Sequence, residues 1–111
     1  MTSIWRGLLQ SVRMTLTETQ KKFLRGLGHE LKPTLIVADA GLSESVMLEF
    51  DATITHHELI KVRIRAADRA SRDAIISDMC IKGSAQLITR IGNVALVYRK
   101  NEDQPKIPVP L

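Results

Sequence analysis

Three basic residues, Lys61, Arg63 and Arg65, alternate with apolar residues between Leu59 and Ala66. Successive side chains of a β-strand point to opposite faces, so this pattern predicts the cations on one face and the apolar side chains on the other. Like charges on one strand face repel mildly, and a bound anion such as a phosphate group would relieve that repulsion. The alternative is a solvated face whose cations pair with acidic residues on neighbouring strands.

A second group of cations surrounds the first predicted helix and its exit: Lys21, Lys22, Arg25 and Lys32. These side chains either contact phosphate groups or keep one side of the helix in water. Each phosphate that a protein neutralises adds close to one unit to the salt dependence of binding, so nucleic-acid binding by these residues would weaken strongly with salt.

The sequence His56-His57-Glu58 invites comparison with a metal site. Adjacent histidines are expected to splay apart on a helix or a strand, and neither an i, i+4 histidine pair nor a cysteine pair accompanies them. We therefore predict no metal and no other cofactor. At a helix C-terminus, a partly protonated imidazole would suit the helix dipole. Cys80 falls in a helical stripe with Ile76 and is predicted to be a core residue and not a nucleophile.

No arrangement of residues in the chain is typical of catalysis. The serines lack the G-x-S-x-G turn, and the glycines form neither a phosphate-binding loop nor a dinucleotide fingerprint. No pair of carboxylates stands out from the charges expected on helix surfaces. The sequence therefore predicts a protein that is not an enzyme and has no small-molecule substrate.

Capping residues mark the starts of three helices. Thr17 and Gln20 form a capping box, Ser43 caps a second helix that should end near His56, and Asp68 caps a third. Gly28 and Gly83 are the predicted ends of the first and third helices. The core-facing stripes are predicted at Phe23, Leu24 and Leu27, then at Val46, Met47, Phe50 and Ile54, and finally at Ala74, Ile75, Ile76, Met79 and Cys80.

Strands are predicted at residues 34–37, 59–66, 86–90 and 94–99, with Gly92-Asn93 as the turn of a hairpin. Residues 38–41 form the turn that leaves the first strand. The order is helix, strand, helix, strand, helix, strand, strand. Two strand-helix-strand crossovers followed by a hairpin predict a four-stranded mixed sheet with helices packed against it, an α/β (α+β) sandwich.

The composition is that of one globular domain with a modest positive charge. Its 111 residues leave room for one hydrophobic core, and 16 Lys and Arg against 12 Asp and Glu give a net charge of +4. This excess favours anionic partners, nucleic acid before acidic lipid. The four aromatic residues are too few for a surface that stacks successive bases, so contacts to a nucleic-acid backbone should dominate.

Cysteine content and hydropathy predict a cytoplasmic protein without a membrane anchor. The single Cys80 cannot form an internal disulfide, and no secretory signal or apolar run of about 20 residues appears. The protein is expected to be a monomer.

Three segments are expected: an N-terminal extension at residues 1–13, one domain at residues 14–100, and a Pro-rich tail at residues 101–111. The extension is either an amphipathic helix for a membrane or a partner, or a frayed end. Its apolar residues fall at helical spacing: Ile4, Trp5, Leu8, Leu9 and Val12. The tail is expected to be extended and loosely held.

Four segments stand in the order TETQKKFLRGLGHELKP, LIVADAGLSESV, HHELIKVRI and IGNVALVYR. Together they resemble the CRM domain family (chloroplast RNA splicing and ribosome maturation), in particular its bacterial stand-alone YhbY-like members. The likeness runs from about Leu16 to Pro108. It implies a KH-like two-layer sandwich similar to the C-terminal domain of a bacterial translation initiation factor.

In this family, the loop between the first strand and the second helix carries a GxxG motif that contacts RNA. The bacterial members are linked to precursors of the large ribosomal subunit. The resemblance therefore implies a non-catalytic protein that binds structured ribosomal RNA as an assembly factor. The alternative is a protein-interaction module that docks to a ribosomal protein or another assembly factor through the amphipathic start or the open sheet.

The corresponding loop of this chain departs from the motif, because its four positions are Ala38, Asp39, Ala40 and Gly41. Glycines let the backbone approach a phosphate, and the helix that follows presents free amides to it. Asp39 should repel a phosphate, by about 1 kcal/mol or less in solvent. We expect a weakened RNA-binding loop, with more of the binding carried by the basic strand and the first helix.

Overall fold

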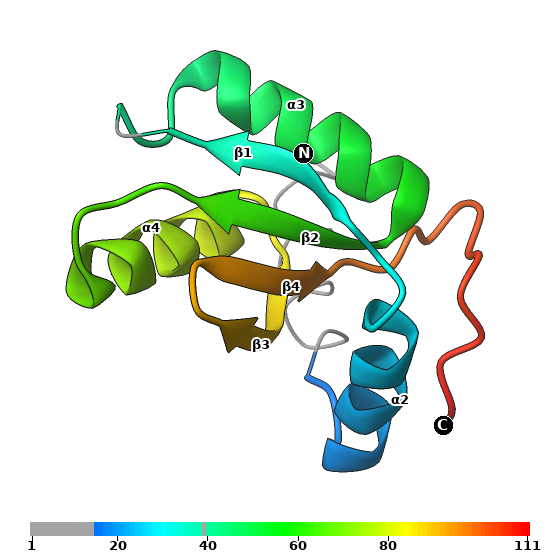
Figure 1. The fold of residues 1–111 in the computed structure, drawn as a ribbon. Coiled ribbons are helices and arrows are strands. Elements are labelled where there is room, and N and C mark those ends of the chain that lie inside the picture. The colour runs from blue at the N-terminus through cyan, green and yellow to red at the C-terminus, as the bar shows by residue number, and fades with distance from the viewer. Residues whose placement is uncertain (1–14, 39) are drawn as a thin grey trace.

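The computed structural model describes residues 15–38 and 40–111, so the predictions for residues 1–13 and for the side chain of Asp39 lie outside the described residues. The predicted order of elements is confirmed (Figure 1). The helices are α2 (Glu18–Gly28), α3 (Glu44–His57) and α4 (Arg69–Lys82). The strands are β1 (Pro33–Val37), β2 (Leu59–Ile64), β3 (Gln86–Ile91) and β4 (Val94–Tyr98).

The four strands form one mixed sheet in the order β1-β2-β4-β3. β1 runs parallel to β2, whereas β4 runs antiparallel to both of its neighbours. α3 and α4 cover one face of this sheet, and α2 lies against one end of the other face (Figure 1). The predicted α/β sandwich is confirmed. None of the described helices has the length and apolar character that a membrane span requires.

The main core lies between the sheet and the pair α3 and α4. Ile60, Val62 and Ile64 of β2 are buried there, as their alternation with basic residues predicts. Phe50 and Ile54 of α3 meet them from the helical layer. The other predicted helical stripe residues vary in burial: Ile76 and Met79 are buried, Val46, Met47, Ile75 and Cys80 are half-buried, and Ala74 is exposed.

A smaller core joins α2 to the opposite face of the sheet. Leu24 is buried against Leu59, Leu96 and Tyr98, which project from β2 and β4. The prediction that Leu27 is buried with Leu24 is wrong, because its side chain is 42% exposed. α2 lies over only one end of the sheet, so no described element covers the face of the helix that carries Leu27.

The predicted helix caps are confirmed. The Gln20 backbone N–H donates to Thr17 Oγ1 at 3.1 Å, and the Thr17 N–H donates to Gln20 Oε1 at 2.9 Å. Asp68 accepts the N–H of Ser71 at 2.7 Å, and this hydrogen bond lowers the pKa of the Asp68 carboxyl. Ser43 accepts the N–H of Val46 at 3.2 Å. These bonds satisfy amides that a helix N-terminus otherwise leaves unpaired.

The expectation of a loosely held tail is wrong. The carboxylate of Glu58, a fully buried side chain, accepts backbone N–H groups of Asn101, Lys106 and Ile107 at 2.7 to 2.8 Å. Gln20 of α2 also donates its side-chain amide to the carbonyl of a proline near the end of the chain, at 2.7 Å. The tail therefore passes the end of α3 and reaches α2, as its orange-to-red trace in Figure 1 shows. A buried carboxylate needs such donors to offset its lost hydration.

Candidate nucleic-acid interface

Among the described residues, α2 covers only one end of its sheet face, and Ile36, Arg63 and Ile91 are exposed on the remainder, called the open face below. Strand pairing places its outward side chains in two rows that run from β1 through β2 and β4 to β3. The first row is Ile36, Arg63, Val94 and Ile91. The second row is Pro33, Lys61, Leu96 and Thr89. The predicted basic row on β2 thus runs down the middle of this face, with apolar residues on both sides.

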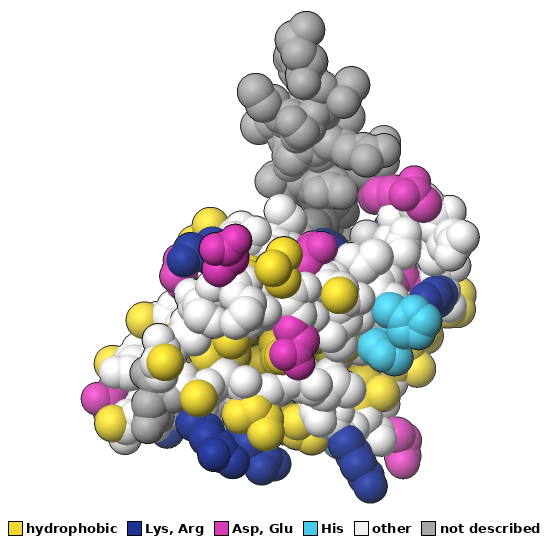
Figure 2. Space-filling model, turned by 90° about the horizontal axis from the view of Figure 1, so that it is seen from above, with side chains coloured by type: hydrophobic (Ala, Val, Ile, Leu, Met, Phe, Trp, Pro, Cys, Tyr) yellow, Lys and Arg dark blue, Asp and Glu magenta, His cyan; other side chains and the backbone are white. Residues whose placement is uncertain are grey.

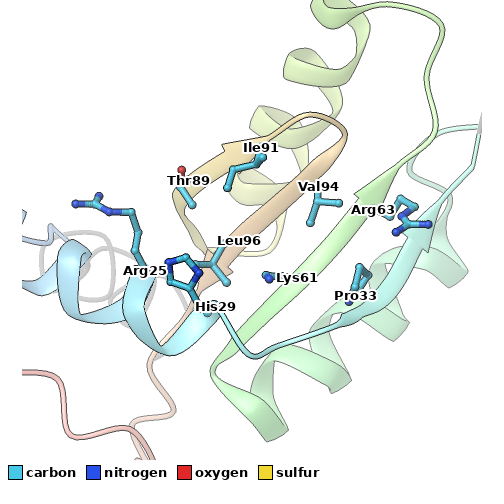
Figure 3. Close-up of a pocket in the computed structure, with 10 residues that line it drawn as sticks. Arg25, His29, Pro33, Lys61, Arg63, Thr89, Ile91, Val94 and Leu96 are labelled. Atoms are coloured by element: carbon cyan, nitrogen blue, oxygen red, sulfur yellow. The ribbon is translucent and has the colours of Figure 1, made fainter.

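A groove of about 340 Å³ lies on this face beside the end of α2 (Figure 3). Its basic side chains come from two elements, Arg25 and His29 from the α2 side and Lys61 and Arg63 from β2. The remaining lining is apolar apart from Thr89. No acidic side chain lines the groove among the described residues. In Figure 2, where α3 faces the viewer, Lys and Arg side chains gather along the lower edge, on the side of the open sheet face.

Within the part of the chain that the structure describes, the cations of this face have no acidic partners. The ion pairs found among residues 15–38 and 40–111 lie elsewhere: they join Arg69 and Arg90 to Asp73, Lys82 to Asp78, and Arg99 to Asp51. The strands beside β2 carry no Asp or Glu at all. The alternative of a basic row balanced by acids on neighbouring strands is therefore wrong.

Arg65 lies just beyond the end of β2 and joins the basic row to the loop that follows β1. Its backbone N–H donates to the Val37 carbonyl at 2.8 Å, and its side chain is exposed. β1 and β2 are parallel, so their C-terminal ends meet at one edge of the sheet. This edge therefore holds both Arg65 and the predicted RNA-binding loop.

The loop itself turns through Gly41, which has φ of +81°. The Gly41 N–H donates to the Ala38 carbonyl at 2.9 Å, and α3 begins shortly after at its cap, Ser43. Glycine adopts positive φ without the steric cost that a Cβ brings, so the surviving glycine of the motif stands where the backbone requires it. The free amides at the start of α3 point toward this end of the molecule, as in many anion-binding sites.

Of the cations predicted around the first helix, the structure brings only Arg25 into the groove. Lys22 and Lys32 are exposed and Lys21 is half-buried, and these three do not line it. His29, which caps the end of α2, lines the groove and was not among the predicted site residues. Its i, i+4 spacing from Arg25 is the signal that could have identified it, because residues at that spacing share one helix face.

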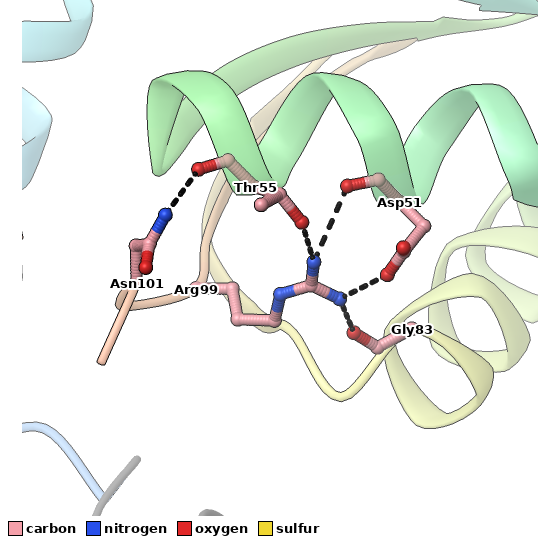
Figure 4. A network of polar contacts seen from close by, with 5 residues as sticks. All are labelled: Asp51, Thr55, Gly83, Arg99 and Asn101. Atoms are coloured by element: carbon pink, nitrogen blue, oxygen red, sulfur yellow. Dashed lines mark hydrogen bonds and ion pairs between the residues drawn. The ribbon is translucent and has the colours of Figure 1, made fainter. Parts of the chain in front are cut away.

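Arg99 is a cation with a different role (Figure 4). Its guanidinium donates to the Asp51 carboxylate at 2.8 Å and to the Gly83 carbonyl at 2.7 Å, and it also contacts Thr55 Oγ1. Asn101 adds a hydrogen bond from its side chain to the Thr55 carbonyl at 3.0 Å. These bonds connect the end of β4 to α3 and to the end of α4. The Arg99 guanidinium therefore stabilises the fold and does not belong to the unpaired cations of the open face.

The residues considered for metal binding or nucleophilic chemistry do not form a reactive cluster. Among the described residues, no three His, Cys, Asp or Glu side chains stand close enough to hold a metal ion. The expectation that His56 and His57 splay apart is wrong, because their rings make an edge-on contact with centroids 4.6 Å apart. Glu58 faces inward to the tail. Burial raises the pKa of the half-buried Cys80 thiol to about 11, which keeps it protonated at neutral pH.

Comparison with known proteins gives consistent matches over most of the chain. The family described as the CRS1 / YhbY (CRM) domain matches residues 16–99. A Pseudomonas aeruginosa protein named as a probable RNA-binding protein is 47% identical over 88 residues, which cover 79% of this chain and 85% of that protein. A Haemophilus influenzae protein named as RNA-binding is 38% identical over 96 residues, 86% of this chain and 96% of its own. The solution structure of a Staphylococcus aureus protein, 26% identical, superposes with a TM-score of 0.75 and covers 86% of this chain and 100% of that one.

Proposed function

The chain belongs to the CRS1 / YhbY (CRM) domain family, and on this premise we propose that it is a non-catalytic RNA-binding protein. Its target is structured ribosomal RNA in precursors of the large ribosomal subunit, where it acts in the cytoplasm as an assembly factor. The relatives named as RNA-binding support the first part of this proposal. The ribosomal target follows from the resemblance of its sequence segments to the bacterial members of the family.

The observation that carries the proposal is the unpaired charge of the open sheet face. Lys61 and Arg63 project from β2, one of the two inner strands, and Arg25 approaches from α2, with no described carboxylate within ion-pair distance of any of them. Unpaired cations on one surface repel one another and attract a polyanion. An RNA backbone that binds there releases its condensed counterions, which supplies a favourable free energy.

The aromatic residues favour contact with the RNA backbone and shape over stacking of many bases. Phe50 and Tyr98 are buried in the two cores, and Phe23 is half-buried beside the second. None of these rings is presented on the open face. Proteins that read extended single strands need several exposed rings, so a structured RNA is the better partner for this surface.

The loop at residues 38–41 provides a second point of contact at the edge of the same face. Arg65 lies beside it, and α3 directs its N-terminal amides toward this edge. A phosphate bound there would be held by backbone amides and by one guanidinium, a combination common at helix N-termini. The open face and the loop together would span more than one phosphate of a folded RNA.

Binding to a fragment of large-subunit ribosomal RNA, measured by fluorescence anisotropy over a range of salt concentrations, tests this proposal. The affinity should fall steeply with salt. The double variant Lys61→Gln and Arg63→Gln should lose roughly tenfold or more in affinity and about two units of salt slope, because it removes two phosphate contacts.

The matched control is Arg69→Gln with Lys82→Gln, which removes the same charge from α4 on the opposite face. This control should change the affinity less than threefold. Equal losses in the two double variants, or RNA binding that ignores salt, would contradict the assigned surface. Co-sedimentation with precursor particles that survives removal of their exposed RNA would point instead to a protein partner.

A further inference from the structure

The groove on the open face has an apolar floor between two sets of cations (Figure 3). Val94 and Leu96 of β4, with Ile91 of β3, form the floor. The cations of α2 stand at one side and those of β2 stand at the other. This arrangement differs from a uniformly basic surface, which would attract phosphate groups without offering anything to a base.

The floor is more apolar than contact with a double helix requires. The side chain of Ile91 is 75% exposed, and Ile36 is exposed in the same row across the sheet. A double helix presents phosphates and riboses outward and keeps its base faces stacked inside. Such a ligand would meet the cations but would leave the floor in contact with water or with polar groups.

We propose that the groove holds one unpaired nucleotide of the RNA, with its base on the apolar floor and its flanking phosphates on the two sets of cations. The inference rests on the proposed function and makes it more specific. A nucleotide within a strand has a phosphate on each side, which matches Arg25 and His29 at one side of the floor and Lys61 and Arg63 at the other. Covering Ile91 and Val94 with a base removes apolar surface from water.

Thr89 gives the floor its one polar side chain. It pairs across from Leu96 and is half-buried. A hydroxyl donates and accepts hydrogen bonds, so it can meet the edge of any base. The groove therefore selects for an unpaired nucleotide with little preference for which base it carries.

The test compares two RNA hairpins that differ only in one unpaired uridine bulged from the stem, using anisotropy at one salt concentration. The wild-type protein should bind the bulged hairpin about tenfold more tightly than the fully paired one. The variant Ile91→Ala should lose most of that difference while its affinity for the paired hairpin stays within about twofold.

Ile81→Ala is the matched control, because Ile81 on α4 is also 75% exposed but lies on the opposite layer of the fold. It should leave both affinities unchanged. If the two hairpins bind equally and Ile91→Ala changes neither affinity, the proposal that the groove holds an unpaired nucleotide is wrong. The proposed salt-dependent binding of RNA would still stand. Failure to bind either hairpin or the ribosomal fragment would instead overturn the proposed function itself.

Discussion

Gly28 at the end of α2 packs so closely against Leu96 of β4 that a Cβ atom added to the glycine would stand 2.5 Å from Leu96 Cδ2. The two residues also line the groove on the open face. Gly28 therefore serves close packing, and it needs no positive φ to end the helix. The position of α2, and with it the cations of one side of the groove, depends on this contact.

Gly28→Ala should lower the free energy of unfolding by about 1 to 3 kcal/mol, because the added methyl group forces α2 away from Leu96 or displaces that side chain. Gly26→Ala in the same helix is the control, since nothing lies within 4 Å of the added Cβ. It should raise stability by about 0.5 to 1 kcal/mol through helix propensity. Urea denaturation measures both, and a stabilising Gly28→Ala would contradict the close packing.

Glu58→Gln should destabilise the protein by about 2 to 3 kcal/mol, because a neutral amide is a poorer acceptor for the three tail N–H groups and places its own NH₂ among them. Glu49→Gln, at an exposed position of α3, is the control and should change stability by less than about 0.5 kcal/mol. Hydrogen exchange should show faster opening at residues 101–107 in the Glu58 variant alone. Unchanged protection there would mean that the carboxylate does not hold the tail.

The single tyrosine, Tyr98, reports on the same region through its pKa. Burial, followed by repulsion from the Glu58 and Glu102 carboxylates, raises this pKa from 10.0 to about 12. Ultraviolet titration of the folded protein should therefore give a midpoint near 12, against about 10 in denaturant. Between these values the unfolded chain loses a proton that the folded chain keeps, so this contribution to stability is full below pH 10 and is lost as the pH rises toward 12.

Two controls accompany the titration of Tyr98. Glu58→Gln should lower the midpoint, because it removes one of the charges that oppose the phenolate. Circular dichroism at each pH should separate titration of the folded state from alkaline unfolding. A midpoint near 10 in protein that remains folded would show that the phenol is hydrated.

In the loop, Asp39→Lys should tighten binding to the ribosomal RNA fragment roughly threefold to tenfold, because it replaces a repulsive charge with an attractive one. Gly41→Asp should weaken binding for two reasons. A side chain at this position makes the φ of +81° unfavourable, and the added carboxylate repels phosphate groups. Asp103→Lys in the tail makes the same charge change at the far end of α3 and should alter affinity less than twofold. No effect of either loop variant would place RNA contact on the sheet face alone.

The features of the fold that the sequence predicts are those set by residues close together in the chain. Thr17, Ser43 and Asp68 cap their helices through bonds that span three residues, and the alternation in β2 separates core from surface by strand geometry. The basic row and the position of the loop follow from the same short-range rules. The prediction that Lys61 and Arg63 share one face was correct for this reason.

The features that the sequence does not predict are long-range. Glu58 meets Lys106 across 48 residues, and no periodicity connects two such positions. In the sequence, Glu58 follows His56 and His57 directly, and nothing in that local pattern indicates a buried carboxylate that binds a distant segment. The groove likewise needs the end of α2 to meet β3 and β4, which is why His29 and Ile91 were not identified as site residues.

The strand order has a consequence for how the chain is made. β4 is synthesised after β3, yet it lies between β2 and β3, and among the described strands it is the one that β3 pairs with. A nascent chain that stops before Val94 therefore leaves unpaired the two strand edges, one on β2 and one on β3, that β4 covers in the folded sheet. The short Gly92-Asn93 turn brings β4 back beside β3 as soon as it leaves the ribosome, which shortens the time during which those edges could pair with another chain.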